Sequence, residues 1–451
     1  MTEQRTLSRP ATGLVLTFLV LCATLPANGQ TLPTPGSSPQ PASPPLAASP
    51  PALGLADLLR LSLEKNPVLG QAGFDIDAAR GRALQAGLYP NPTVSVGGDE
   101  VGGRVGRAGI VTLPRVNQEI VTGGKLRLSR AVAEREVDQA TLTLLRQRFA
   151  LFTTVREGYF EVLATQRRIE VLTELVGLAK QSTENAQKVM GAGEGSKPDL
   201  LQFQIELDRL LVERESAERE LTAGWRRLTS AMGTPNLPYN VLLGSLEDPL
   251  PDYDFDRSRS YLLEIHPEVR FAQVGVTRAQ LALRRAEVER IPNVTVGAGY
   301  TANFKDRDSE VQYQLSVPVP IFNRNQGNIH AAQAELGRSL REVERVQNDL
   351  TGRLATAFGQ YASARQRAER YRTSILPAAR ESYRLTLLAF RGGQFEYLRV
   401  LQAQRGIGEA NLTYVQALQE QWRAASEIAG LLLEEDWPWS TQPPCAASAN
   451  R

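Results

Sequence analysis

The amino-acid sequence of 451 residues predicts a mixed α and β membrane protein with an internal two-fold repeat. Three observations predict it: sequence anchors that recur about 200 residues apart, apolar stripes at helical spacing over very long stretches, and two runs that alternate apolar and polar residues. Together they indicate long helices accompanied by four short strands in each chain.

The repeat is visible in short anchors that keep their order. Tyr89-Pro90-Asn91 returns as Ile291-Pro292-Asn293, and Asn66-Pro67 returns as His266-Pro267, each about 200 residues later. Such a repeat makes the chain a tandem of two similar halves. The predicted organisation is a signal peptide (1–29), a flexible Pro/Ser-rich arm (30–51), a first repeat (52–236), a linker (237–254), a second repeat (255–434) and a polar tail (435–451).

The N-terminus has the features of an export signal. Two arginines precede the apolar run Leu14–Leu25, and the small residues Ala27 and Gly29 suit a cleavage just after them. The run is too short to cross a bilayer as a helix. Lipid anchoring at Cys22 is possible but not favoured, because Leu21 is too large for the position before a lipidated cysteine.

Composition and motifs exclude several classes of protein. Lys and Arg number 51 against 49 Asp and Glu, a balance that argues against a nucleic-acid partner. Outside the signal no apolar run is long enough for a transmembrane helix, which excludes a helical membrane protein. The sequence has no Gly-x-Ser-x-Gly elbow, no His-Glu-x-x-His motif and no Walker loop, so we expect neither an enzyme nor a cofactor.

Tight metal binding is not expected either. Removal of the signal leaves Cys445 as the one cysteine, so no intrachain disulfide is expected, and the chain has two histidines. His266 precedes Pro267 and is expected to cap a helix, whereas His330 is expected to be solvated or packed. With no Cys/His cluster, we expect no transition-metal site.

Each half is predicted to contain a helical segment (53–88 and 257–290), a short β region and then a very long helix (124–190 and 327–390). A rod of sixty-odd residues is on the order of 100 Å long, so the rods must pack side by side as a bundle or tube. We expect Pro377 to kink the second rod and Gly177 to weaken the first. The apolar stripe of the second rod consists of Leu336, Leu340, Val343, Val346, Leu350, Leu354 and Phe358.

Glycine-containing turns end the rods. Gly191–Gly195 leads into Ser196, a predicted helix cap, and Pro198 suits the first turn of the next helix. Arg391–Gln394 is expected to play the same part in the second half.

The β regions point to a membrane. Apolar and polar residues alternate over 294–304 and again over 311–319, on either side of a charged loop at 305–310; the first half has a rougher copy over 94–96 and 110–120, around the loop 97–109. This fits a transmembrane hairpin, although a soluble hairpin with one face on a core has the same period. Four strands cannot close a barrel, so if the hairpins span a membrane, several copies of the chain must contribute strands to one barrel. We expect Val294, Val296, Tyr300, Tyr313 and Leu315 to face lipid, and Thr295, Thr301, Gln312 and Gln314 to face the lumen.

These features resemble the TolC-type outer membrane efflux protein family, over roughly residues 52–434. The strand-to-helix turns Gln118–Lys125 and Val317–Ile329 are most similar to those of the CzcC-like branch, which exports cations and heavy metals.

The resemblance implies a homotrimer whose strands form a twelve-stranded barrel in the cell outer membrane, continued by a long periplasmic α-helical barrel. It implies a passive exit duct for metal cations or small toxic compounds. A periplasmic adaptor and an inner-membrane pump of the resistance-nodulation-division type would deliver the substrate. The implied partners are therefore further copies of the chain, the adaptor, the pump and outer membrane lipid.

The resemblance also assigns the turns at the ends of the rods. The adaptor-docking residues would be Gly191, Gly193, Gly195, Ser196, Gly392 and Gly393. Glu194, Asp199 and Glu396 are candidates for a ring of carboxylates that gates the pore and favours cations, or they are ordinary solvated turn residues.

Two other functions compete with the channel. A periplasmic adaptor also carries a long helical hairpin, but it has one hairpin and additional β domains. A coiled-coil scaffold of the cell envelope would not need the alternating strands.

Overall fold

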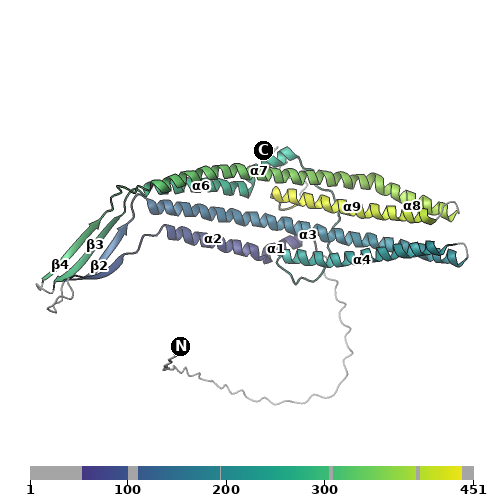
Figure 1. Ribbon diagram of the computed structural model, residues 1–451, viewed down its shortest axis with the longest axis horizontal. Coiled ribbons are helices and arrows are strands. Elements are labelled where there is room, and N and C mark those ends of the chain that lie inside the picture. The colour runs from purple at the N-terminus through teal and green to yellow at the C-terminus, as the bar shows by residue number, and fades with distance from the viewer. Residues whose placement is uncertain (1–52, 100–109, 193–194, 304–307, 393–396, 439–451) are drawn as a thin grey trace, which may run out of the picture. The chain divides into compact units, whose positions relative to one another are not determined.

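The computed structural model describes residues 53–99, 110–192, 195–303, 308–392 and 397–438 (Figure 1). The predicted signal peptide, Cys22, the arm over 30–51 and the tail from residue 439 lie outside the described residues.

Elements of the same type follow one another in the same order after residue 55 and after residue 255. The first series is α1 (Leu55–Lys65), α2 (Pro67–Ala86), β1 (Thr93–Asp99), β2 (Ile110–Ile120), α3 (Lys125–Gly191) and α4 (Lys197–Ala231). The second is α5 (Phe255–Ile265), α6 (Pro267–Val288), β3 (Val294–Asn303), β4 (Asp308–Ser316), α7 (Gln326–Arg370), the π-helical segment η1 (Tyr371–Ile375), α8 (Leu376–Arg391) and α9 (Tyr397–Leu431).

The predicted helical segments 53–88 and 257–290 each consist of two helices, and the second helix of each pair begins at a proline. Asn66 and His266 have extended backbone conformations, because a following proline disfavours the helical conformation. Each then caps the next helix. The Asn66 side chain accepts a hydrogen bond from Val68 N at 2.8 Å, and His266 Nδ1 accepts one from Glu268 N at 3.3 Å. The predicted capping role of His266 is confirmed.

The long helices begin and end close to their predicted bounds. α3 starts directly after Gly123 and Gly124, whose φ angles of 66° and 69° favour glycine, and it continues through Gly177 without a break. In the second half η1 interrupts the rod just before Pro377, which lacks the amide hydrogen that a regular helix needs. No described helix holds an apolar stretch that is long enough to cross a bilayer.

Helix α3 is the centre of the packing. It contacts α2, α4, α6 and α9, and α7 packs against α6 and α9 (Figure 1). Phe160 of α3 stacks on Trp422 of α9 with 4.1 Å between ring centroids. The predicted stripe of α7 is buried at Val346, Leu350 and Leu354, but Leu340 is 51% exposed. The stripe is therefore a packing seam along part of the rod.

The four strands form one antiparallel sheet in the order β1-β2-β3-β4. Three predicted strand bounds were wrong, namely both ends of β4 and the end of β1. β4 covers Asp308–Ser316 and so begins within the predicted loop 305–310; it ends before Pro318, because proline has no amide hydrogen to donate to a neighbouring strand. β1 extends to Asp99, into the predicted loop 97–109.

Candidate functional site

One face of the sheet is apolar and exposed. Val296 lies opposite Leu315, and Tyr300 lies opposite Val311 on the neighbouring strand. Tyr313 is 83% exposed and Leu315 is 70% exposed, whereas Val294 is half-buried. The alternation predicted from the sequence is confirmed, and it places Val294, Val296, Tyr300, Tyr313 and Leu315 on the same face. Contact of this face with lipid stays a prediction.

The opposite face is polar and built around small residues of β3. Gly297, Gly299 and the side chain of Thr301 are buried, and Gln314 and Gln312 lie opposite the two glycines. The residues predicted to face the lumen, Thr295, Thr301, Gln312 and Gln314, all belong to this face by register. Longer polar side chains on β2 and β4 thus stand on both sides of the small residues of β3.

A hydrogen-bonded network joins the two halves where the sheet meets the helices. Lys125 is buried at the start of α3, and its Nζ donates to Asn293 Oδ1 at 2.7 Å and lies 3.7 Å from Glu289 Oε1. Asn293 Nδ2 donates to Glu119 Oε1 at 2.6 Å. The interpretation of Gly123-Gly124-Lys125 as a strand-to-helix break is correct, but its contacts were not predicted. The repeated Pro-Asn anchor was the signal that marked this site.

The turn between α3 and α4 is held by local contacts. Ser196 Oγ accepts from Asp199 N at 3.3 Å and donates to Asp199 Oδ2 at 2.5 Å, which confirms Ser196 as the cap. A Cβ atom on Gly195 would lie 3.0 Å from Met190 N, so a side chain there would crowd the end of α3.

The docking and gate residues are only partly described. Those described, Gly191, Gly195, Ser196, Asp199 and Gly392, are exposed. Gly193, Glu194, Gly393 and Glu396 lie outside the described residues. The docking and gate roles stay predictions.

Near these turns a second polar site connects α4 to α9. Arg405 holds the buried carboxylate of Glu206 through Nε at 2.7 Å and Nη2 at 2.6 Å. Ser182 of α3 donates to Gln404 Oε1 at 3.3 Å. The sequence did not predict this pairing, because the partners are far apart in the chain and neither motif nor spacing marks them.

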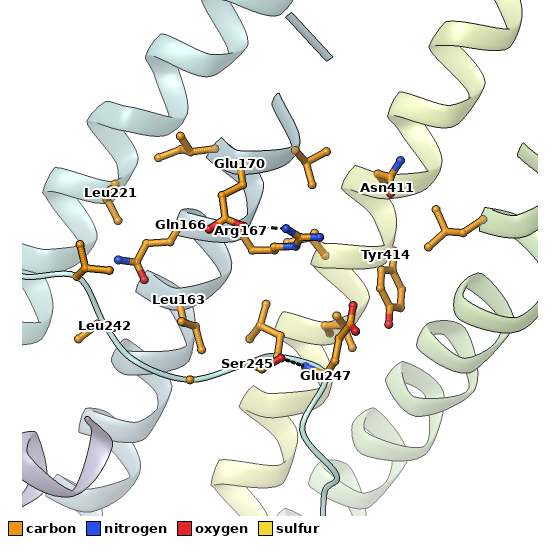
Figure 2. Close-up of a pocket in the computed structure, with 18 of the residues that line it drawn as sticks. Leu163, Gln166, Arg167, Glu170, Leu221, Leu242, Ser245, Glu247, Asn411 and Tyr414 are labelled. Atoms are coloured by element: carbon orange, nitrogen blue, oxygen red, sulfur yellow. Dashed lines mark hydrogen bonds and ion pairs between the residues drawn. The ribbon is translucent and has the colours of Figure 1, made fainter. Parts of the chain in front are cut away.

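A cavity of about 540 Å³ lies between α3, α9 and the segment 239–247 (Figure 2). Arg167 pairs with Glu170 at 2.7 Å, and Ser245 Oγ accepts from Glu247 N at 3.1 Å. Burial raises the pKa of Tyr414, and the carboxylate of Glu247 adds to the effect. The residues that line this cavity include neither histidine nor cysteine, and its polar groups form no nucleophile–base pair.

A buried charged cluster fastens the segment that follows α9. Arg156 Nη2 donates to the carbonyl oxygens of Glu434 at 2.6 Å and Glu435 at 3.0 Å, and Tyr253 OH donates to Glu434 Oε2 at 3.0 Å. Burial raises the pKa of the Glu434 carboxyl to about 7, although Tyr253 and Arg156 oppose the shift. The cluster joins α3, the linker and the end of α9.

The two histidines lie in different environments. His330 is exposed, and burial lowers the pKa of His266 to about 4. Among the described residues, no group of three His, Cys, Asp or Glu side chains is placed to hold a metal ion.

Comparison with known proteins agrees with this arrangement. The chain is 27% identical to the cobalt-zinc-cadmium resistance protein CzcC of Cupriavidus metallidurans, over 84% of this chain and 90% of that protein. It is 26% identical to the proteases secretion protein PrtF of Dickeya chrysanthemi, over 85% and 90%. The outer-membrane channel OprN has the same fold, with a TM-score of 0.73, 19% identity, and coverage of 84% of this chain and 89% of that structure.

The match to a family is equally extensive. The family described as outer membrane efflux protein matches residues 58–234 and again residues 259–432. The two matched segments each contain a pair of strands and the long helices that follow them. The chain therefore belongs to the outer membrane efflux protein family, and it is a channel rather than an enzyme.

Proposed function

We propose that this outer membrane channel is a homotrimer and the exit duct of a tripartite system that removes divalent metal cations. Members of the family work with a periplasmic adaptor and an inner-membrane pump. The observation that carries the proposal is the four-stranded sheet with one apolar face, one polar face and two open edges.

The sheet supports an assembly of several copies. Within the described part of the chain, β1 and β4 are edge strands, and each pairs with one neighbour. Backbone groups in lipid must all be paired, so a sheet in the membrane must close into a barrel. Membrane barrels have about eight strands or more. Three copies supply twelve strands, with the apolar face toward lipid and the polar face toward water.

The helices support the same assembly through a missing contact. Helix α6 packs against both α3 and α7, whereas its counterpart α2 packs against α3. If the two halves are a repeat, the missing neighbour of α2 is the α7 helix of the next copy. Phe74 and Leu84 share one side of α2 and are exposed, with Phe74 76% exposed, and this neighbour would cover them.

Exposed apolar residues near the rod ends agree with this arrangement. Leu201, Ile205 and Val212 lie at helical spacing along α4, and Leu385 and Leu388 lie on α8. A ring in which α4 of one copy packs on α8 of the next would bury both sets. Such an interface joins two different surfaces and closes by rotation.

Divalent metal cations are the proposed substrates. CzcC is described as a cobalt-zinc-cadmium resistance protein, and the similarity extends over most of both chains. A duct needs no tight site for its cargo, because tight binding would slow release. In this proposal the pump selects the metal.

The exposed turns are the proposed docking site. Gly191 ends α3, Gly195 and Ser196 follow it, and Gly392 follows α8. Both turns therefore lie at the ends of the rods that are farthest along the chain from the strands. The adaptor would contact these turns and their neighbours Gly193 and Gly393.

The proposal is tested by deleting the gene and measuring growth in cobalt, zinc and cadmium salts. We expect sensitivity to rise and to be restored by the wild-type gene. The complementing protein should fractionate with the outer membrane as an oligomer that dissociates on heating. Unchanged metal tolerance combined with lost protease export would instead assign the duct to secretion, as the name of PrtF describes for that protein.

A further inference from the structure

One basic side chain lies in the middle of the polar face. Arg115 of β2 is opposite Ser95 of β1 and Gly299 of β3, and Gly299 is opposite Gln312 of β4. These residues form a single row across the four strands. Arg115 is the one Lys or Arg residue within the described strands.

The row holds the guanidinium group in place. Gly299 has no side chain, so Arg115 extends across β3, and its Nη2 donates to Gln312 Oε1 at 3.2 Å. Arg115 is half-buried, while Gly299 beneath the row is buried. The charge is thus fixed above the sheet by an uncharged partner and is not neutralised by a carboxylate at that position.

Acidic residues lie to either side of the row on the same face. Glu119 is opposite Thr295, toward the helices, and Asp308 is opposite Asn303, at the other end of the sheet. Thr295 and Asn303 are each four residues along β3 from Gly299, so each acidic residue lies about 13 Å along the sheet from the row of Arg115. Glu310 is opposite Thr301, two residues or about 7 Å along β3. The polar face therefore carries a positive charge between two negative regions.

We propose that Arg115 is a selectivity-determining residue of the pore. The inference rests on the proposed function, since three copies would place three guanidinium groups at one level inside the barrel. Together they raise the electrostatic potential there, oppose the passage of cations and favour anions. The hydrogen bond to Gln312 does not require a charge, because a neutral amide donates to the same oxygen.

The expected size of the effect follows from screening. In water at 0.1 M salt the Debye length is about 10 Å, comparable to the distance from the wall to the axis of a twelve-stranded barrel. Removal of three charges at that distance should raise the permeability ratio of K⁺ over Cl⁻ by about two- to fourfold. In 1 M salt, where the Debye length is about 3 Å, the change should nearly disappear.

The test measures reversal potentials of the purified full-length oligomer in planar bilayers under a KCl gradient. Arg115→Gln should raise the K⁺ to Cl⁻ permeability ratio, and Arg115→Lys should retain the wild-type ratio. Gln312→Glu adds a carboxylate beside the guanidinium and should raise the ratio without removing Arg115. The matched control is Arg60→Gln on α1, which removes the same charge from an exposed side chain of a helix that packs on α3.

The outcomes separate this inference from the proposed function. Wild-type protein that gives no conductance would contradict the channel itself. A working channel whose ratio is the same in Arg115→Gln, Gln312→Glu and the wild type would overturn the role of Arg115. If Arg115→Gln fails to assemble, Gln312→Glu alone decides, and an unchanged ratio in that variant rejects the inference.

Discussion

At the scale of single residues, Glu434 is expected to make stability depend on pH. Its folded pKa of about 7 is above the ordinary value of 4.5, so the folded protein favours the neutral carboxyl. The stabilisation is complete below about pH 4.5 and is lost as pH rises through 7. Glu434→Gln keeps an acceptor for Tyr253 and cannot ionise. We expect its stability to change little between about pH 5 and 8, while the wild type loses on the order of 2–3 kcal/mol.

Thermal unfolding followed by helical circular dichroism in detergent, at a series of pH values, measures this difference. Glu435→Gln is the control, since its carboxylate is about half exposed and pairs with Arg148 at 3.0 Å. Equal pH dependence in the wild type and Glu434→Gln would show that the buried carboxyl does not govern stability.

At the scale of elements, the two faces of the sheet should respond differently to charge. Tyr313→Arg places a cation on the apolar face of β4 and should cost about 2–4 kcal/mol if that residue lies near the bilayer centre. Gln314→Arg, one residue further on the opposite face, should be tolerated. The measurement is the amount of heat-sensitive oligomer in outer membrane fractions of each variant. Comparable losses in both variants would contradict the assignment of the faces.

Substitutions in the turns at the rod ends should abolish efflux without preventing assembly. Gly193→Trp or Gly393→Trp is expected to leave oligomers in the outer membrane but abolish metal resistance, because a bulky side chain keeps the adaptor from approaching the backbone. Cross-linking to the adaptor should fall in parallel. Gly177→Ala, inside α3 and outside the turns, is the control, since a Cβ atom there meets no neighbour within 4 Å. Loss of assembly in the tryptophan variants would make these glycines folding elements.

Elements with strong local signals were predictable from the sequence. Helix α3 was placed within a residue at each end, because glycines stand at both ends. The helix start at His266-Pro267 was predictable because proline suits the first turn of a helix, and its counterpart Asn66-Pro67 caps a helix in the same way. Pairs such as Glu206 with Arg405 were not predictable, because their contact depends on how α4 and α9 pack and not on local spacing.

At the scale of the whole molecule, a ring of carboxylates near the turns is expected to make the resting pore cation-selective. In the proposed trimer, threefold symmetry would multiply any inward-facing residue among Glu194, Asp199 and Glu396, and a ring of this kind should bind divalent cations that reduce conductance. This effect is opposite in sign to that of Arg115 and acts at the other end of the duct.

Single, double and triple neutral variants in planar bilayers test the gate. Asp199→Asn is preferable to alanine, because the carboxylate accepts from Ser196 Oγ at 2.5 Å and the amide retains an acceptor. We expect weaker block by millimolar divalent cations and lower cation selectivity. An unchanged reversal potential across the whole series would identify these residues as solvated turn residues.

The two open edges of the sheet have a consequence for inheritance. In the proposed trimer each copy offers β1 to one neighbour and β4 to another, so a copy with one damaged edge would still join a ring through the intact edge. With equal amounts of damaged and normal chains mixing at random, about one trimer in eight would be free of damaged copies. Lesions confined to one edge strand should therefore be dominant, whereas a chain that never folds should be recessive.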